Sequence, residues 1–157
     1  MYKLIGAVIL VLAALFCSAY ILLREKKHIE QLGGFTELIR QIYKQIEAFN
    51  LPMPDIMKSL DRDILKSCGA SGQECVTIGS LLNREELFLT QKEKKLILDF
   101  SLGLGRCYRD EQLKLCKYYL DELEGRLSII RSEYPKKRKL TLTLCFCAAL
   151  GLIILMI

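Results

Sequence analysis

The feature that most constrains this chain is a heptad pattern of apolar residues that runs into a basic and then an uncharged segment. Seven positions, spaced alternately three and four residues apart, form the pattern: Leu113, Cys116, Leu120, Leu123, Leu127, Ile130 and Tyr134. This spacing predicts a helix seam that packs lengthwise against other helices. Four consecutive cations follow at 136–139, and residues 140–157 carry no charge. The pattern therefore predicts a long packing helix joined to a membrane span.

The start of the chain carries a second uncharged run, at residues 4–23. Twenty helical residues at about 1.5 Å each cover roughly 30 Å, the hydrocarbon thickness of a bilayer. A cleaved signal peptide is the alternative, but this run exceeds the roughly 7–15 apolar residues of such segments. Lipoprotein cleavage at Cys17 is disfavoured by the bulky Leu15 and Phe16 before it. We expect transmembrane helices at 4–23 and 140–157 and a domain at 24–139.

The charges beside the two uncharged runs predict the orientation of the chain. Seven cations lie on the inner side of the runs: Arg24, Lys26, Lys27, Lys136, Lys137, Arg138 and Lys139. On the outer side stand Lys3 and the amino terminus. The positive-inside rule then places the middle segment in the cytoplasm. A solvated charge run or a nucleic-acid patch is the alternative for 136–139, but its position against an apolar run favours an anchor to anionic lipids.

Composition separates the middle segment from the ends and argues against nucleic acid as a partner. The chain has 157 residues, of which 52% are hydrophobic and 26% charged, so the apolar residues must be partly segregated. All 18 acids and 22 of the 23 Lys and Arg lie at 24–139, a net charge of 22 − 18 = +4. A nucleic-acid-binding domain would present a basic face with few acids in it. We therefore expect no nucleic-acid partner.

The middle segment predicts an all-α bundle of five to six helices, because no stretch alternates as strands do. Apolar residues at 35–49 recur on one helical face, and a second helix is expected from Pro54 to Gly69–Gly72. Between the first uncharged run and this face, Gly33–Gly34 is expected to interrupt the helix, either as a hinge or as a plain loop. A short third helix is expected around residues 75–82.

Two capping boxes, at 83–86 and 90–93, predict helix starts, since an N-cap side chain and an acid three residues later satisfy each other's free N–H groups. The second is expected to open a helix that ends at Gly103 and Gly105.

The sequence does not predict a catalytic or metal site. His28, the only histidine, is expected to be a solvated surface group. The middle segment has four cysteines: Cys68, Cys75, Cys107 and Cys116. Their spacings match neither the paired ligands of structural zinc sites nor the C-x-x-C redox motif, and they suggest reduced thiols in a cytosolic setting. We expect a non-catalytic protein without a cofactor or a small-molecule substrate.

Three stretches resemble one known family. The chain opens with Lys3-Leu4-Ile5-Gly6-Ala7, and it ends with a basic run that leads into an apolar tail containing Gly151. Between them, Phe100, Leu104-Gly105 and Gln112 match the pattern F-G-x-x-L-G-x-x-D-x-x-x-Q, although Ser101 replaces its first Gly and Tyr108 replaces its Asp. With these features the chain resembles the stage III sporulation protein AB family of endospore-forming bacteria.

The resemblance implies a helical cytosolic domain similar to that of type II secretion platform proteins, held between two membrane helices on the mother-cell side. It implies a scaffold subunit of the channel complex between mother cell and forespore. The implied partners are the membrane, the stage III sporulation AA-type secretion ATPase and the other subunits of that complex. Family-like residues and charges cluster at one corner, which we take as the hypothetical docking site: Arg106, Arg109, Asp110, Glu111 and Gln112.

Three alternatives stay open at this point. A generic inner-membrane platform protein of a pilus or secretion system would show more than two spans or a duplicated domain. An exported lipoprotein would lose the first 16 residues, which precede Cys17. A thiol or metal enzyme would contain bound metal on purification.

Overall fold

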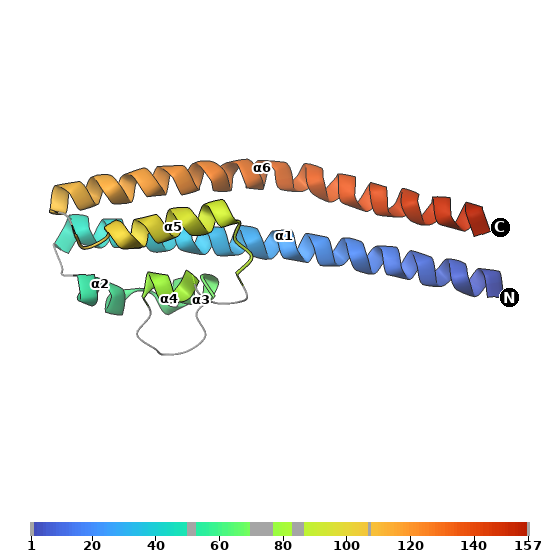
Figure 1. Cartoon of the computed structure of the whole chain (residues 1–157), viewed down its shortest axis with the longest axis horizontal. Helices are drawn as coiled ribbons and strands as arrows, with labels where there is room; N and C mark the ends of the chain where they lie inside the picture. The colour runs from blue at the N-terminus through green and yellow to red at the C-terminus, as the bar shows by residue number, and fades with distance from the viewer. Residues whose placement is uncertain (1, 50–52, 70–76, 83–86, 107, 157) are drawn as a thin grey trace. The chain divides into compact units, whose positions relative to one another are not determined.

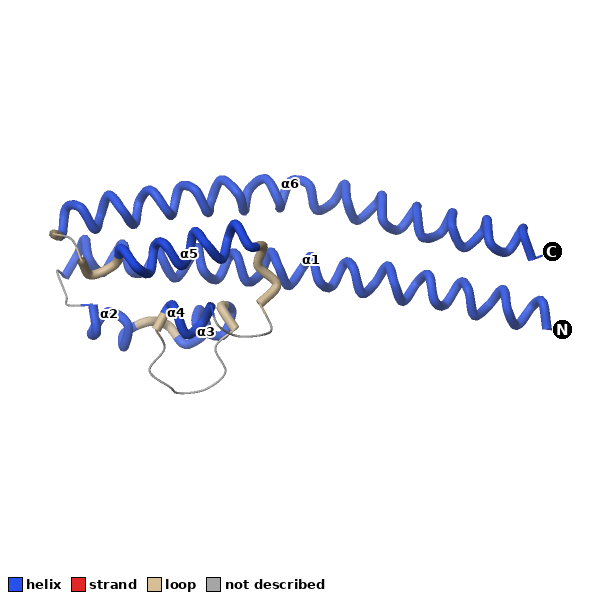
Figure 2. The backbone as a smooth tube through the Cα atoms, viewed as in Figure 1, coloured by secondary structure: helices blue, strands red, loops and turns tan. Residues whose placement is uncertain are grey.

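The computed structural model describes residues 2–49, 53–69, 77–82, 87–106 and 108–156, with side chains except at 2–5, 7, 8, 10, 49, 53, 54, 57, 153, 155 and 156. These ranges form six helices and no strand, which confirms the all-α prediction for the described part (Figures 1 and 2). The helices are α1 (Tyr2–Phe49), α2 (Met53–Ser59), α3 (Arg62–Ser67), α4 (Ile78–Leu82), α5 (Gln91–Gly103) and α6 (Arg109–Met156).

The chain divides into two compact units. The terminal unit comprises Met1–Lys27 and Ile130–Ile157, and the central unit comprises His28–Ile129. Because α1 and α6 are long, each contributes residues to both units, while α2 to α5 belong to the central unit alone.

The core of the central unit is built from apolar residues of all its longer helices. The side chains with 0% exposure include Phe35 and Ile42 of α1, Ile97 and Phe100 of α5, and Leu123 of α6. Phe100 also makes an edge-to-face contact with Tyr119, with ring centroids 5.6 Å apart, so α5 packs against α6 through an aromatic pair. Removing this apolar surface from water is the main force that holds the helices together.

The expected interruption at Gly33–Gly34 is wrong, because α1 runs unbroken through both glycines. Gly34 is buried, and a Cβ atom added there would lie only 3.0 Å from the backbone carbonyl carbon of Ser67 at the end of α3. The missing side chain therefore serves a close helix approach. Glycine is unfavourable in a helix by about 1 kcal/mol relative to alanine, and here tertiary packing offsets that cost.

The second helix predicted from Pro54 is two helices, α2 and α3, with a break at Leu60 and Asp61. Asp61 has extended backbone angles, φ −64° and ψ 130°, and its carboxylate accepts a hydrogen bond from the Asp63 N–H at 3.1 Å. Asp61 is thus an N-cap, which starts a new helix instead of continuing the old one. Gly69 has a φ of 94° and ends α3, as expected, whereas Gly72 lies outside the described residues.

The helix predicted from the second capping box is confirmed as α5, with Thr90 and Glu93 forming both hydrogen bonds of the box. It ends at Gly103, and Gly105 follows with a φ of 79°. The short third helix is α4, in which Ile78 and Leu81 are buried. The other predicted box at 83–86 and the cysteines at 75 and 107 lie outside the described residues.

In the terminal unit α1 and α6 run antiparallel, with Lys137 Nζ 4.0 Å from Glu25 Oε1, and α6 continues through Pro135. Ser18 and Ala149, both buried, lie where the two helices face each other. Within the described residues, neither α1 nor α6 nor any other helix holds a stretch long and apolar enough to cross a membrane. Of the predicted spans, residue 157 and the side chains of 4, 5, 7, 8, 10, 153, 155 and 156 lie outside that description.

Candidate functional site

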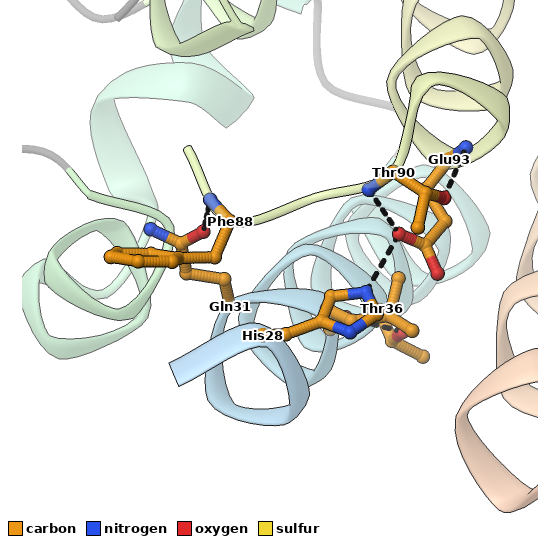
Figure 3. Close-up of polar contacts among 7 residues, drawn as sticks. His28, Gln31, Thr36, Phe88, Thr90 and Glu93 are labelled. Atoms are coloured by element: carbon orange, nitrogen blue, oxygen red, sulfur yellow. Dashed lines mark hydrogen bonds and ion pairs between the residues drawn. The ribbon is translucent and has the colours of Figure 1, made fainter. Parts of the chain in front are cut away.

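A polar centre joins α1 to the start of α5 through His28 and Glu93. His28 Nε2 lies 2.8 Å from Glu93 Oε2, and the same oxygen accepts the Thr90 N–H at 2.7 Å (Figure 3). The side chains of His28 and Glu93 are only 18% and 4% exposed. The expectation that His28 is a solvated surface group is therefore wrong, because the histidine is an interhelical partner of a buried carboxylate.

The pKa of Glu93 follows from two opposing effects. Burial alone raises the pKa of the carboxyl, since it penalises the charged form. The hydrogen bonds from His28 and Thr90, and the attraction of His28, favour the charged form and win, so the pKa of Glu93 lies below its ordinary value. The carboxylate is thus held ionised at neutral pH in a nearly water-free position.

The next turn of α1 also contacts the segment before α5, through a hydrogen bond to Gln31. The Phe88 N–H donates to Gln31 Oε1 at 2.8 Å, and the buried Thr36 hydroxyl bonds back to the carbonyl of Leu32 at 2.8 Å (Figure 3). His28 and Gln31 lie three residues apart, on the helix face that also presents Leu32. This shared face with a buried leucine is the sequence signal that could have indicated their burial.

The polar centre is suited to holding helices together. Among the described residues, no three His, Cys, Asp or Glu side chains gather in a group that could hold a metal ion. Cys68 and Cys116 are buried, and burial raises the pKa of their thiols to about 12 and about 11. Both thiols therefore stay protonated at neutral pH and act as small apolar residues.

The seven seam positions of α6 are all shielded to some degree. Cys116, Leu123 and Leu127 are buried, and the remaining four are half-buried: Leu113, Leu120, Ile130 and Tyr134.

An ion pair links α1 to α6 beside this seam. Arg40 of α1 contacts Glu37 of its own helix and, at 2.6 Å, Glu124 of α6. The hydrogen bond to Glu124 raises the pKa of Arg40. Both partners are more than one third exposed, so this ion pair contributes little beyond fixing the register.

At the predicted docking corner the residues have different roles. The guanidinium of Arg109 donates to the carbonyl oxygens of Ile46 at 3.3 Å and Glu47 at 2.6 Å. It thereby satisfies free carbonyl groups at the C-terminal end of α1, where a positive charge is also favoured by the helix dipole. Asp110 and Glu111 lie in the first turn of α6, which favours acids for the same reason.

Three residues of this corner have exposed side chains and no such contact to α1 among the described residues: Arg106, Asp110 and Glu111. Tyr108 beside them is 86% exposed, whereas Gln112 is half-buried and its N–H donates to the Tyr108 carbonyl at 2.9 Å. Sequence reasoning missed Tyr108 because the family pattern has an aspartate at that position.

The seven cations predicted to anchor the chain are all exposed, and they lie in the terminal unit. Lys137 meets two acids, Glu25 of α1 at 4.0 Å and Glu133 of its own helix at 3.6 Å. The contact with Glu25 brings the cations that precede 140–157 to the same level as those that follow 4–23. The two basic stretches thus lie together at one end of the paired uncharged runs.

Comparison with known proteins completes the assignment. Neither the curated proteins nor the solved structures contain a match to this chain. A protein-family model does match, over residues 3–157, and its description is stage III sporulation protein AB. The match extends from the opening residues to the last, and it includes the three stretches that carry the resemblance in the sequence. This chain therefore belongs to the stage III sporulation protein AB family.

Proposed function

We propose that the chain is a non-catalytic scaffold subunit of the sporulation complex between mother cell and forespore, inserted in the membrane on the mother-cell side. In this proposal the central unit faces the cytoplasm and works as the cytosolic domains of type II secretion platform proteins do. Membership of a stage III sporulation family supports the process. The uncharged runs at 4–23 and 140–157, at the outer ends of α1 and α6, support the membrane insertion.

The observation that carries this proposal is the meeting of the two basic stretches at one end of the terminal unit. Lys137 lies 4.0 Å from Glu25, so residues 24–27 and 136–139 lie side by side. A hairpin of two spans would need this arrangement, because both inner flanks would then lie at one membrane surface. Each cation near an anionic surface contributes about 1 kcal/mol of binding. Seven exposed cations are therefore a sufficient anchor for the cytoplasmic side.

We further propose that the cognate AA-type secretion ATPase docks at the corner between α5 and α6. The exposed groups there, Arg106, Tyr108 and Glu111, combine an aromatic ring with charges of both signs. Tyrosine and arginine are enriched among residues that carry binding energy at protein interfaces. Arg109 is excluded from this surface because its guanidinium is engaged with the carbonyls of Ile46 and Glu47.

Membrane insertion and orientation can be tested together in sporulating cells. The full chain should stay in the membrane pellet after alkaline carbonate extraction, and its intact mass should include the first 16 residues. A protease site inserted between Gly69 and Gly72 should resist external protease in intact mother cells. Cleavage at that site in intact cells would overturn the orientation, and loss of the first 16 residues would make the chain an exported lipoprotein.

ATPase docking can be tested with charge reversal at exposed positions only. The double variant Arg106→Glu/Glu111→Lys should lose capture of the ATPase from detergent-solubilised membranes, while helix content and melting temperature stay as in the wild type. The matched control, Lys95→Glu/Asp121→Lys, likewise exchanges an exposed cation and an exposed acid, on α5 and α6 away from the corner. Undiminished capture by the folded corner variant would rule out this surface as the docking site.

A further inference from the structure

An apolar groove separates α1 from α6 in the terminal unit. One wall is the α1 face from Val11 to Ser18, and the other is the α6 face from Leu142 to Ala149. The groove has a volume of about 370 Å³, within the range of roughly 300–1,000 Å³ that is usual for small-molecule sites. It is therefore large enough to hold part of an extended apolar molecule.

The chemistry of the walls favours a hydrocarbon. The two hydroxyl groups among the lining residues are already used: Ser18 donates to the Leu15 carbonyl at 2.9 Å and Thr143 to the Lys139 carbonyl at 2.9 Å. The walls thus present no hydroxyl that lacks a partner. A polar ligand would leave its own groups unpaired in this groove, which costs free energy, whereas a hydrocarbon chain would not.

Cations lie at one end of the groove. Lys139 precedes Leu142 by three residues, about 4.5 Å of helix rise, and Lys139 and Arg138 are both exposed. From Lys139 to Ala149 the helix rises about 15 Å, which is half of the roughly 30 Å of bilayer hydrocarbon. The groove and its basic end therefore match one leaflet in depth, with the charges at the level of the headgroups.

We propose, on the basis of the membrane insertion proposed above, that this groove binds one acyl chain of an anionic phospholipid. The phosphate of that lipid contacts the cations at the basic end, with Arg138 and Lys139 on α6 and Arg24 on α1. Charge decides between possible occupants. Seven cations lie at this end, where Lys137 faces two acids, Glu25 and Glu133, so the end of the groove carries a net positive charge. A second apolar helix would fill the groove without using this charge.

The test compares lipid retention by groove-filling and control variants of the full chain. Each protein is reconstituted in nanodiscs of equal phosphatidylglycerol and phosphatidylcholine, released, and analysed by native mass spectrometry. Ala14→Leu/Cys145→Leu adds bulk inside the groove, whereas Ala13→Leu/Cys147→Leu adds the same bulk at exposed neighbouring positions. We expect the groove variant to retain about tenfold less phosphatidylglycerol than the wild type, given the apolar contact removed. The control should retain as much as the wild type.

A second pair of variants tests the headgroup contact. Arg138→Gln/Lys139→Gln should lose the preference for phosphatidylglycerol over phosphatidylcholine, and Lys44→Gln/Lys95→Gln in the central unit should keep it. Equal preference in both variants and the wild type would overturn the assigned headgroup contact.

Other outcomes separate the inference from the proposed function. Equal lipid retention by the groove variant and its control would show that the groove is not the lipid site. A lipid-free dimer in the wild type that the groove variant abolishes would assign the groove to a second copy of the chain. Release of the wild type by alkaline carbonate would instead contradict membrane insertion itself, whatever lipid is retained. Unchanged helix content by circular dichroism establishes that each variant is folded.

Discussion

The contacts that join helices in the central unit differ from those along the groove walls of the terminal unit. In the central unit polar side chains reach across to other helices, as Glu93 does to His28 and Arg109 does to the end of α1. In the terminal unit the Ser18 and Thr143 hydroxyls bond back to their own helices. Large apolar side chains point outward there, Phe16 with 82% exposure and Ile154 with 73%. The same two helices are thus built for water in one unit and, we propose, for lipid in the other.

The largest effect should come from placing one charge in each unit. In α6, Leu123→Asp buries an unpaired carboxylate in the central core and should lower the free energy of unfolding by about 3–5 kcal/mol, because Leu123 is 0% exposed. Chemical denaturation followed by circular dichroism measures this. A variant as stable as the wild type would show that the seam does not form the core.

The matching substitution in the terminal unit is Leu144→Asp, at a position that is 64% exposed. It should leave the denaturation midpoint of the central unit unchanged, while weakening membrane insertion by about 2.5–3.5 kcal/mol, the cost of an aspartate within a span. Carbonate extraction of expressed protein measures the insertion. If Leu144→Asp had no effect on extraction, the terminal unit would not be surrounded by lipid, and the proposed contrast with the water-exposed central unit would be wrong.

Two helical glycines, one tightly packed and one in open space, should respond differently to substitution by alanine. A Cβ atom at Gly34 would meet Ser67, with its carbonyl carbon at 3.0 Å, whereas a Cβ at Gly125 would meet nothing within 4 Å. Gly34→Ala should therefore destabilise the central unit by about 1–3 kcal/mol through overpacking. Gly125→Ala should be neutral or stabilise by up to about 1 kcal/mol, because alanine favours the helix. Equal melting temperatures for the two variants would contradict the close approach of α3 to α1.

Local signals in the sequence predicted local structure well. The capping box at Thr90 and Glu93 and the end of α5 at Gly103 depend on residues a few positions apart, and the structure has both. The break at Asp61 was equally local and could have been found, since aspartate is a preferred N-cap. The break was not predicted because apolar residues at 56, 57, 60, 64 and 65 keep a helical spacing across Asp61.

Long-range contacts could not be predicted in this way. Glu93 is 65 residues from His28 in the sequence, and Arg109 is 62 residues from Glu47. Nothing in the composition around His28 indicates that a buried carboxylate will meet it. The role of Gly34 likewise depends on Ser67, which only the packing of α3 brings close. In the candidate docking corner, the sequence therefore indicated a group of charged residues. It could not show that one of them, Arg109, is bonded to carbonyl groups of α1.

Acid should test the polar centre of the central unit. The pKa of Glu93 is lowered from 4.5, so its carboxylate stabilises the fold at pH values above that and stops doing so as pH falls through the folded pKa. Glu93→Gln should flatten this loss of stability between about pH 5 and pH 3, and His28→Ala should cost about 1–2 kcal/mol at pH 7. Urea unfolding at each pH measures both, with the exposed Glu111→Gln as control. An unchanged acid limb in Glu93→Gln would contradict this role.

The smallest effect should separate structure from binding at the corner. Arg109→Gln removes the charge that caps the C-terminal end of α1 and should lower stability by about 0.5–1 kcal/mol. Arg106→Gln removes an exposed charge three residues before α6 begins and should change stability by less than about 0.5 kcal/mol. If ATPase docking uses the corner, capture should fall in Arg106→Gln although its melting temperature is unchanged. Well below its melting temperature, the Arg109→Gln variant should still capture the ATPase, because it is then fully folded without the helix cap. The opposite pattern, with stability lost at Arg106 and capture lost only at Arg109, would reverse the roles assigned to the two arginines.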